Sequence, residues 1–234
     1  MTPRPPSSPA ARLLTLVAFA VLAFVSPALA TDPTLHPLAT ATQATARARL
    51  LTGLAGVQSV TLFTASSSDV PVLWVKVINR PVWRIAFTPR KLSTRYYEDR
   101  YFRNFVVLLD QATGALISVE AKYSGPHPPT PYSRSAQEQG LQDGDENYTG
   151  FPTQNPGPHC TFYNVLQSSI FGAILAKEIK AYYVDYTPID GDQPHPRWII
   201  CLNGTPLGEV IPYTTFVRFV VNAENGELIS ACNF

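Results

Sequence analysis

In two short segments of the chain a large apolar residue recurs at every second position. The residues that share a face are Trp83, Ile85 and Phe87 in the first segment and Trp198, Ile200 and Leu202 in the second. This alternation is typical of a β-strand that packs one face on a core, because successive side chains of a strand point to opposite sides. In the second segment the alternation places Cys201 on the face opposite Trp198.

Both segments belong to a longer internal repeat. Residues 105–118 match residues 217–230 without a gap, and Asp110 aligns with Asn222 while Gly114 aligns with Gly226. An Asp or Asn followed four residues later by Gly predicts a hairpin, since the Asx side chain closes a turn on backbone amides and Gly supplies a positive φ. The repeat therefore predicts one hairpin in each copy.

A helix is expected ahead of the strands in each copy. Residues 40–54 contain helix-forming residues and no Pro, and Gly53 and Gly56 are stop signals. Residues 161–177 carry an apolar stripe at helical spacing. Further strands are expected at residues 57–63, 72–78 and 179–186.

The predicted fold class is α+β, with two tandem units. Each unit is one helix packed on an antiparallel sheet of three to four strands. The expected boundaries are residues 31–123 for the first unit and 159–234 for the second. Residues 124–158 are rich in Pro, Gly, Ser and Gln and are interpreted as a linker.

The first thirty residues have the pattern of a secretory signal peptide. Arg4 and Arg12 precede an apolar run at residues 13–25, and Ala28-Leu29-Ala30 forms a small-x-small cleavage site ahead of Thr31. The run is shorter than the roughly 20 residues that a membrane-spanning helix needs. The sequence therefore predicts a cleaved, secreted or periplasmic protein without a membrane span.

The charge of the expected mature chain is close to neutral. Without Arg4 and Arg12, sixteen of the eighteen basic residues remain against seventeen acidic ones. Nucleic-acid binding depends on many cationic contacts to phosphates, so nucleic acid is excluded as the expected partner.

The pattern of helix, strand, Trp strand and Asp-x-x-Thr-Gly-x-Leu hairpin resembles the PepSY domain. The residues that carry the likeness are Ala44, Ala48, Leu51, Gly56, Val57, Trp83, Ile85, Val107, Leu109, Asp110, Thr113, Gly114 and Leu116 in the first copy, and Trp198, Ile200, Phe219, Val221, Asn222, Gly226 and Leu228 in the second. PepSY domains occur in propeptides of thermolysin-like proteases and in many exported bacterial proteins. The resemblance implies a cystatin-like helix on a curved sheet, a binding or inhibitory role, and no catalytic residues.

No motif of a known catalytic or cofactor site occurs in the chain. The four histidines each lie beside a proline, and the cysteines and histidines lack the spacing of a zinc site, so neither a metal nor another cofactor is predicted. Two groups of acids lack the pattern of a calcium loop and are interpreted as solvated turn residues. They are Asp143, Asp145 and Glu146, and Asp185, Asp190 and Asp192.

The expected function is that of an exported non-catalytic binding protein, a protease inhibitor or modulator whose partner is another exported protein. Two alternatives stay open. One is a structural accessory protein of the cell envelope, and the other is a hydrolase with an unrecognised site.

One segment is dense in Arg and Tyr, which are enriched at protein interfaces. The candidate partner-binding residues are Arg95, Tyr96, Tyr97, Arg100, Tyr101 and Arg103. The competing interpretation is that the aromatics pack on their own sheet while the arginines pair with Glu98 and Asp99.

Three cysteines remain after the signal peptide, and in an oxidising compartment two of them are expected to form a disulfide. Strand parity places Cys201 and Cys232 on one face, but a third strand separates them in a simple meander. A bridge from Cys160 to Cys201 or Cys232 is therefore favoured over a bridge between Cys201 and Cys232.

Overall fold

The structure is a computed structural model, and it describes residues 35–88, 90–94, 97–123, 147–167, 174–187, 195–206 and 215–233. All of them belong to one unit, Pro33–Phe234. The predicted signal peptide and most of the predicted linker lie outside the described residues.

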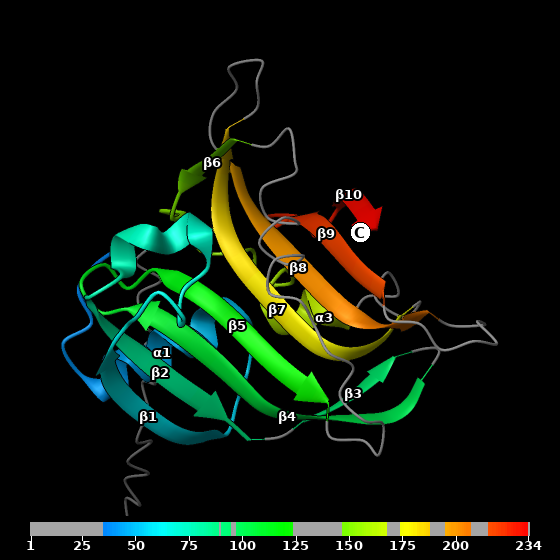
Figure 1. Cartoon of the computed structure of the whole chain (residues 1–234), viewed down its shortest axis with the longest axis horizontal. Helices are drawn as coiled ribbons and strands as arrows, with labels where there is room; N and C mark the ends of the chain where they lie inside the picture. Colours follow the sequence, from blue (N-terminus) through cyan, green and yellow to red (C-terminus); the bar gives the residue numbers. More distant parts are fainter. Residues whose placement is uncertain are drawn as a thin grey trace, which may run out of the picture. The chain divides into compact units, whose positions relative to one another are not determined.

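The fold is dominated by one antiparallel sheet, shown in Figure 1. The main path of the sheet runs β1-β2-β4-β5-β7-β8-β9-β10, while β3 pairs with β4 and β6 pairs with β7. The strands are β1 (Val57–Thr64), β2 (Pro81–Phe87), β3 (Arg90–Thr94), β4 (Tyr97–Asp110), β5 (Leu116–Tyr123), β6 (Asn147–Gly150), β7 (Ile174–Thr187), β8 (His195–Pro206), β9 (Thr215–Asn222) and β10 (Leu228–Asn233). The helical segments are α1 (Ala41–Thr52), the 3₁₀ segment η1 (Val72–Val77) and α3 (Phe162–Leu166).

The sheet buries apolar side chains on both of its faces. On one face, Trp83 and Trp198 belong to a core that also contains residues of α1 and α3, such as Leu51 and Phe162. On the other face, Trp74 of η1 belongs to a second core, which includes Cys201. Cys201 and Trp198 therefore lie on opposite faces, as the alternation predicts.

The first predicted helix is confirmed. Thr40 caps α1 and forms a capping box with Gln43, since each side chain accepts a hydrogen bond from the other residue's backbone N–H. Gly53 ends the helix with φ +69°, and its N–H donates to the carbonyl of Arg49. Small and apolar residues such as Ala44, Ala48 and Leu51 are buried against the sheet.

The predicted fold class of two helix-on-sheet units is wrong. Strand β5 pairs with β7, with Val119 opposite Ala181 and Lys122 opposite Glu178, so the strands of both copies form one continuous sheet. Among the described helices only α1 is longer than two turns. The β5–β7 pairing is a contact between strands distant in sequence, and the pattern within one copy carries no information about it.

The second predicted helix is wrong at its C-terminal end. A helix is expected over residues 161–177; α3 covers Phe162–Leu166, residues 168–173 lie outside the described residues, and Ile174 already starts β7. Strand β7 pairs along its length with β8, from Ile174 opposite Pro206 to Tyr186 opposite His195. The ladder of hydrogen bonds to β8 thus outweighs the local helical spacing of the apolar residues.

The strand expected at residues 72–78 is the 3₁₀ segment η1 instead. Trp74 and Val77 lie three residues apart, which is one turn of a 3₁₀ helix, and both are buried in the second core. A short apolar run fits a buried strand and a buried helical turn equally well, so its type is decided by packing.

The first four strands along the sheet (β1, β2, β4 and β5) and the last four (β7, β8, β9 and β10) pair in the same register at corresponding positions. Trp83 lies opposite Leu109 in the β2–β4 pair, and Trp198 lies opposite Val221 in the β8–β9 pair. The irregularity between β4 and β5 recurs at the same place between β9 and β10. The predicted turns are confirmed, with φ values of +69° at Gly114 and +77° at Gly226.

Candidate partner-binding site

The Arg- and Tyr-rich segment lies on a two-stranded hairpin formed by β3 and the first part of β4, here called the β3–β4 arm (residues 90–103; Figure 1). Strand β4 is fourteen residues long. Its second part, from Phe105 to Asp110, pairs with β2, and its first part pairs with β3. One long strand therefore connects the arm directly to the core of the sheet.

The structure places four of the six predicted partner-binding residues on β4. These four are Tyr97, Arg100, Tyr101 and Arg103. Arg95 and Tyr96 lie between β3 and β4, outside the described residues. The hairpin brings the two strands together, with Thr94 opposite Tyr97 and Leu92 opposite Arg100.

The strand register adds basic residues that the sequence interpretation missed. Lys91 lies opposite Tyr101 and Arg90 lies opposite Phe102 in the β3–β4 pair, while Lys122 of β5 lies opposite Arg103. Residues 90–103 contain five basic and two acidic residues, so the arm is cationic in a chain whose net charge is only +1. The adjacent pair Arg90-Lys91 was visible in the sequence, but only the register connects Lys122 to the arm.

Ion pairs lie at the base of the arm, where β5 meets β7. Lys180 Nζ lies 3.5 Å from Glu120 Oε1, and Lys122 Nζ lies 3.9 Å from Glu178 Oε1. The Lys122 side chain is 71% exposed, so its ion pair contributes little to stability. These pairs place charged, partly exposed side chains at the base of the arm.

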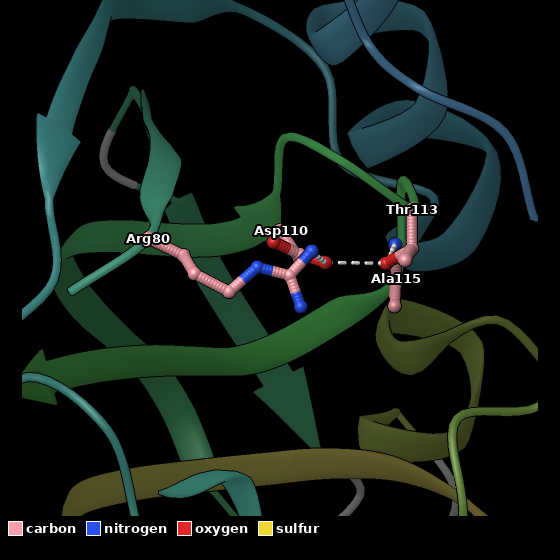
Figure 2. A network of polar contacts seen from close by, with 4 residues as sticks. All are labelled: Arg80, Asp110, Thr113 and Ala115. Carbon is pink, nitrogen blue, oxygen red and sulfur yellow. Dashed lines mark hydrogen bonds and ion pairs between the residues drawn. The ribbon is translucent and has the colours of Figure 1, made fainter. Parts of the chain in front are cut away.

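The far end of β4 is anchored by a polar network around Asp110 (Figure 2). The Asp110 carboxylate, which is fully buried, accepts hydrogen bonds from Arg80 Nη2 at 3.0 Å and from the Thr113 hydroxyl at 2.6 Å. The backbone N–H of Asp110 donates to the carbonyl of Ala115 at 2.9 Å, which closes the β4–β5 turn. The network joins the segment before β2 to the end of β4 and so fixes the strand that carries the arm.

The three cysteines are unpaired in the structure. Cys160 belongs to the core on the helix face and Cys201 to the core on the opposite face. Cys201 and Cys232 lie in one cross-strand row, with Arg218 of β9 between them. Disulfide formation stays a prediction, to be decided by peptide mapping under non-reducing conditions.

Burial suppresses the reactivity of two of the thiols. It raises the pKa of Cys160 above its ordinary value. It raises the pKa of Cys201 to about 12, against the opposing effect of Arg218 and Lys180. A thiol with such a pKa is protonated at neutral pH, and the thiolate is the form that acts as nucleophile or metal ligand.

The acids interpreted as turn residues lie mainly outside the described residues. Of the six, only Asp185 is described. It lies in β7, and burial raises its pKa while His195 acts in the opposite direction. Among the described residues, no group of three or more His, Cys, Asp or Glu side chains gathers to hold a metal ion.

No helix in the described part of the chain is long and apolar enough to cross a membrane. The chain matches no protein-family model, and neither a curated protein nor a solved structure is found to be similar to it.

Proposed function

We propose that the chain is an exported, non-catalytic protein-binding protein that contacts its partner through the β3–β4 arm. The observation that carries this proposal is the arm itself. It concentrates Arg and Tyr, the residue types that supply most hot spots of protein interfaces, on a hairpin built from the longest strand of the first half of the sheet.

The construction of the arm favours recognition of a protein surface. Its two strands pair from Arg90 opposite Phe102 to Thr94 opposite Tyr97, so little conformational entropy is lost when a partner binds. The excess of basic residues favours an acidic partner surface and speeds its encounter. The partner class we propose is an exported protease, in keeping with the PepSY resemblance, with the chain acting as its inhibitor or modulator.

The proposal is tested with proteases purified from the culture fluid of the host. Each is titrated with the chain, and both the Kd and the residual protease activity are measured. The double variant Arg100→Glu/Arg103→Glu is expected to weaken binding at least about ten-fold, which corresponds to about 1.4 kcal/mol. The matched control is Arg84→Glu, which reverses the charge of an exposed arginine of β2, away from the arm.

A protease that binds the arm variant and the wild type equally well would exclude the arm as the contact surface. Absence of binding to any exported protease would exclude the proposed partner class. Export is tested separately, by N-terminal sequencing of the protein recovered outside the cytoplasm, and the expected first residue is Thr31.

A further inference from the structure

The junction between β5 and β7 shows how the last strand of one half of the sheet meets the first strand of the next. The two strands are antiparallel, with Val119 opposite Ala181 and Glu120 opposite Lys180. Both halves have the same succession of four strands. The outer edge of β10 therefore corresponds to the edge of β5 that pairs with β7, and the outer edge of β1 corresponds to the edge of β7 that pairs with β5.

Strand β10 occupies in the second half of the sheet the position that β5 occupies in the first half. Cys232 lies opposite Arg218 of β9, just as Glu120 lies opposite Val106 of β4. In the gapless alignment of the repeat, Cys232 therefore corresponds to Glu120 and Ala231 to Val119.

Strand β1 occupies in the first half of the sheet the position that β7 occupies in the second half. Ser59 lies opposite Ala86 of β2, just as Lys180 lies opposite Cys201 of β8. Val60 corresponds to Ala181 in the same way, because these two lie opposite Ile85 and Ile200. Strands β1 and β10 end the succession of paired strands, as Figure 1 shows.

Three apolar side chains of the two end strands are exposed, whereas their counterparts on β5 and β7 are buried. Leu62 of β1 is 46% exposed, whereas Tyr183, its counterpart in β7, is 1% exposed. Leu228 and Ile229 of β10 are 37% and 47% exposed, whereas Leu116 and Ile117, their counterparts in β5, are 2% and 0% exposed. Apart from these three, the only large apolar side chains exposed in the described part of the chain are Leu50 and Val75.

The two end strands carry one bulge each, between Val57 and Ser59 and between Leu228 and Ser230, but they lack the charged residues and prolines that most often protect a free edge. Neither β1 (VQSVTLFT) nor β10 (LISACN) contains a charged residue or a proline. Free edges of natural sheets are usually blunted by Lys, Pro or a cover, since a bare apolar edge pairs with other strands.

We infer that β10 of one copy of the chain pairs antiparallel with β1 of a second copy, in the register of the internal β5–β7 junction. In this register Cys232 lies opposite Ser59 of the second copy and Ala231 lies opposite its Val60. The contact joins two different surfaces, so it is head to tail, and repetition leads to an open row of copies or a closed ring. The inference does not depend on the proposed function.

Cysteine cross-linking tests the pairing and its register. The variant Ser59→Cys, incubated with oxidised glutathione, is expected to form covalent oligomers in which residue 59 is joined to Cys232 of another copy. Directly opposed residues have Cα atoms about 4.5–5.5 Å apart, within the range of a disulfide. Ser59→Cys/Cys232→Ser is the matched control and is expected to give no oligomer ladder.

A second pair of positions checks the register independently. Thr61 of one copy is expected opposite Ser230 of the next, so Thr61→Cys/Ser230→Cys/Cys232→Ser also forms the ladder. Thr61→Cys alone, with native Cys232, does not form it. A cross-link between Cys232 of both chains would indicate a symmetric β10–β10 contact and would overturn the inference.

The native mass in solution is the third readout. By size-exclusion chromatography with light scattering, the wild-type mass is expected to rise with concentration in steps of one copy. Leu62→Lys/Ile229→Lys is expected to remain monomeric with an unchanged Tm. Val75→Lys, which places the same charge on η1 at an exposed apolar residue, keeps the wild-type behaviour. A monomeric wild type at every concentration, with no ladder from Ser59→Cys, would refute the pairing.

Discussion

The indole Nε1 of Trp198 donates a hydrogen bond of 2.8 Å to the backbone carbonyl of Cys160. In the first half of the chain, Trp83 makes the equivalent bond of 2.9 Å to the carbonyl of Leu38. Leu38 and Cys160 both lie just ahead of a helix, so each tryptophan ties the start of its helix to the central strand of its half. Both rings are buried, and that of Trp198 lies against Phe162 and Tyr183.

Replacing either tryptophan is expected to destabilise the fold strongly. Trp83→Ala and Trp198→Ala should each lower the free energy of unfolding by about 3–5 kcal/mol, because a large ring is removed from the core. Trp→Phe at the same positions keeps an aromatic ring but leaves the carbonyl without its donor, at a cost of about 1–3 kcal/mol. Urea titration followed by circular dichroism measures both, and a loss under about 1 kcal/mol for both Ala variants would contradict the assigned role.

The ion pair between Arg80 and Asp110 is expected to couple the two residues energetically. Asp110 is fully buried and Arg80 about one third exposed, so Asp110→Asn should cost about 1–3 kcal/mol through the weakened hydrogen bonds. A double-mutant cycle with Arg80→Met is expected to give a coupling energy of about 0.5–3 kcal/mol. Glu224→Gln, at an exposed residue of the corresponding turn in the second half, is the control and should change stability by less than about 0.5 kcal/mol. Additive losses in the cycle would show that the pair is not coupled.

The two turn glycines are expected to differ in their tolerance of a side chain. Both have a positive φ, so Gly→Ala costs about 1–2 kcal/mol at either position, and Gly→Val costs more. A Cβ at Gly114 would lie 2.7 Å from the backbone carbonyl oxygen of His36, whereas one at Gly226 would lie 3.5 Å from Cys160 Sγ. Thermal melts should therefore rank Gly114→Ala below Gly226→Ala in stability, and equal or reversed Tm values would show that the His36 segment yields without cost.

The buried thiol of Cys201 predicts a loss of stability at alkaline pH. Burial raises its pKa from 9.0 to about 12, so between these values the thiol ionises in the unfolded chain but not in the folded one. The unfolded chain then binds fewer protons, and stability falls by about 1.4 kcal/mol per pH unit through this group. The contribution is fully present below pH 9 and is lost as the pH rises towards 12.

The variant Cys201→Ala separates this effect from the titration of other groups. Its free energy of unfolding, measured in urea from about pH 8 to about pH 11, should fall less steeply than that of the wild type, by about the amount that one thiol contributes. Parallel pH profiles for the two proteins would mean that Cys201 is accessible to ionisation in the folded state.

The partner-binding site was only partly predictable. The density of Arg and Tyr at residues 95–103 is a property of the sequence and needed no fold to be seen. Arg90, Lys91 and Lys122 join the same site through strand pairing, with Lys122 opposite Arg103. Arg90 and Lys91 stand close to that segment in the sequence, but the pairing of β4 with β5 that places Lys122 beside it could not be read from the sequence.

Local chemistry alone determined helix α1, the strands that carry Trp83 and Trp198, and the two turns at Gly114 and Gly226. For the helix and the turns the decisive interactions lie within a few residues along the chain, as with the Thr40 cap and the positive φ of the glycines. For the two strands the local alternation of apolar residues indicated the type of element, while pairing with neighbouring strands fixed their place in the sheet. Tertiary structure decided whether residues 72–78 and 174–177 became helix or strand, because their apolar runs fit either form. It also decided that the two copies share one sheet, since only the pairing of β5 with β7 joins edges that each copy would otherwise leave free.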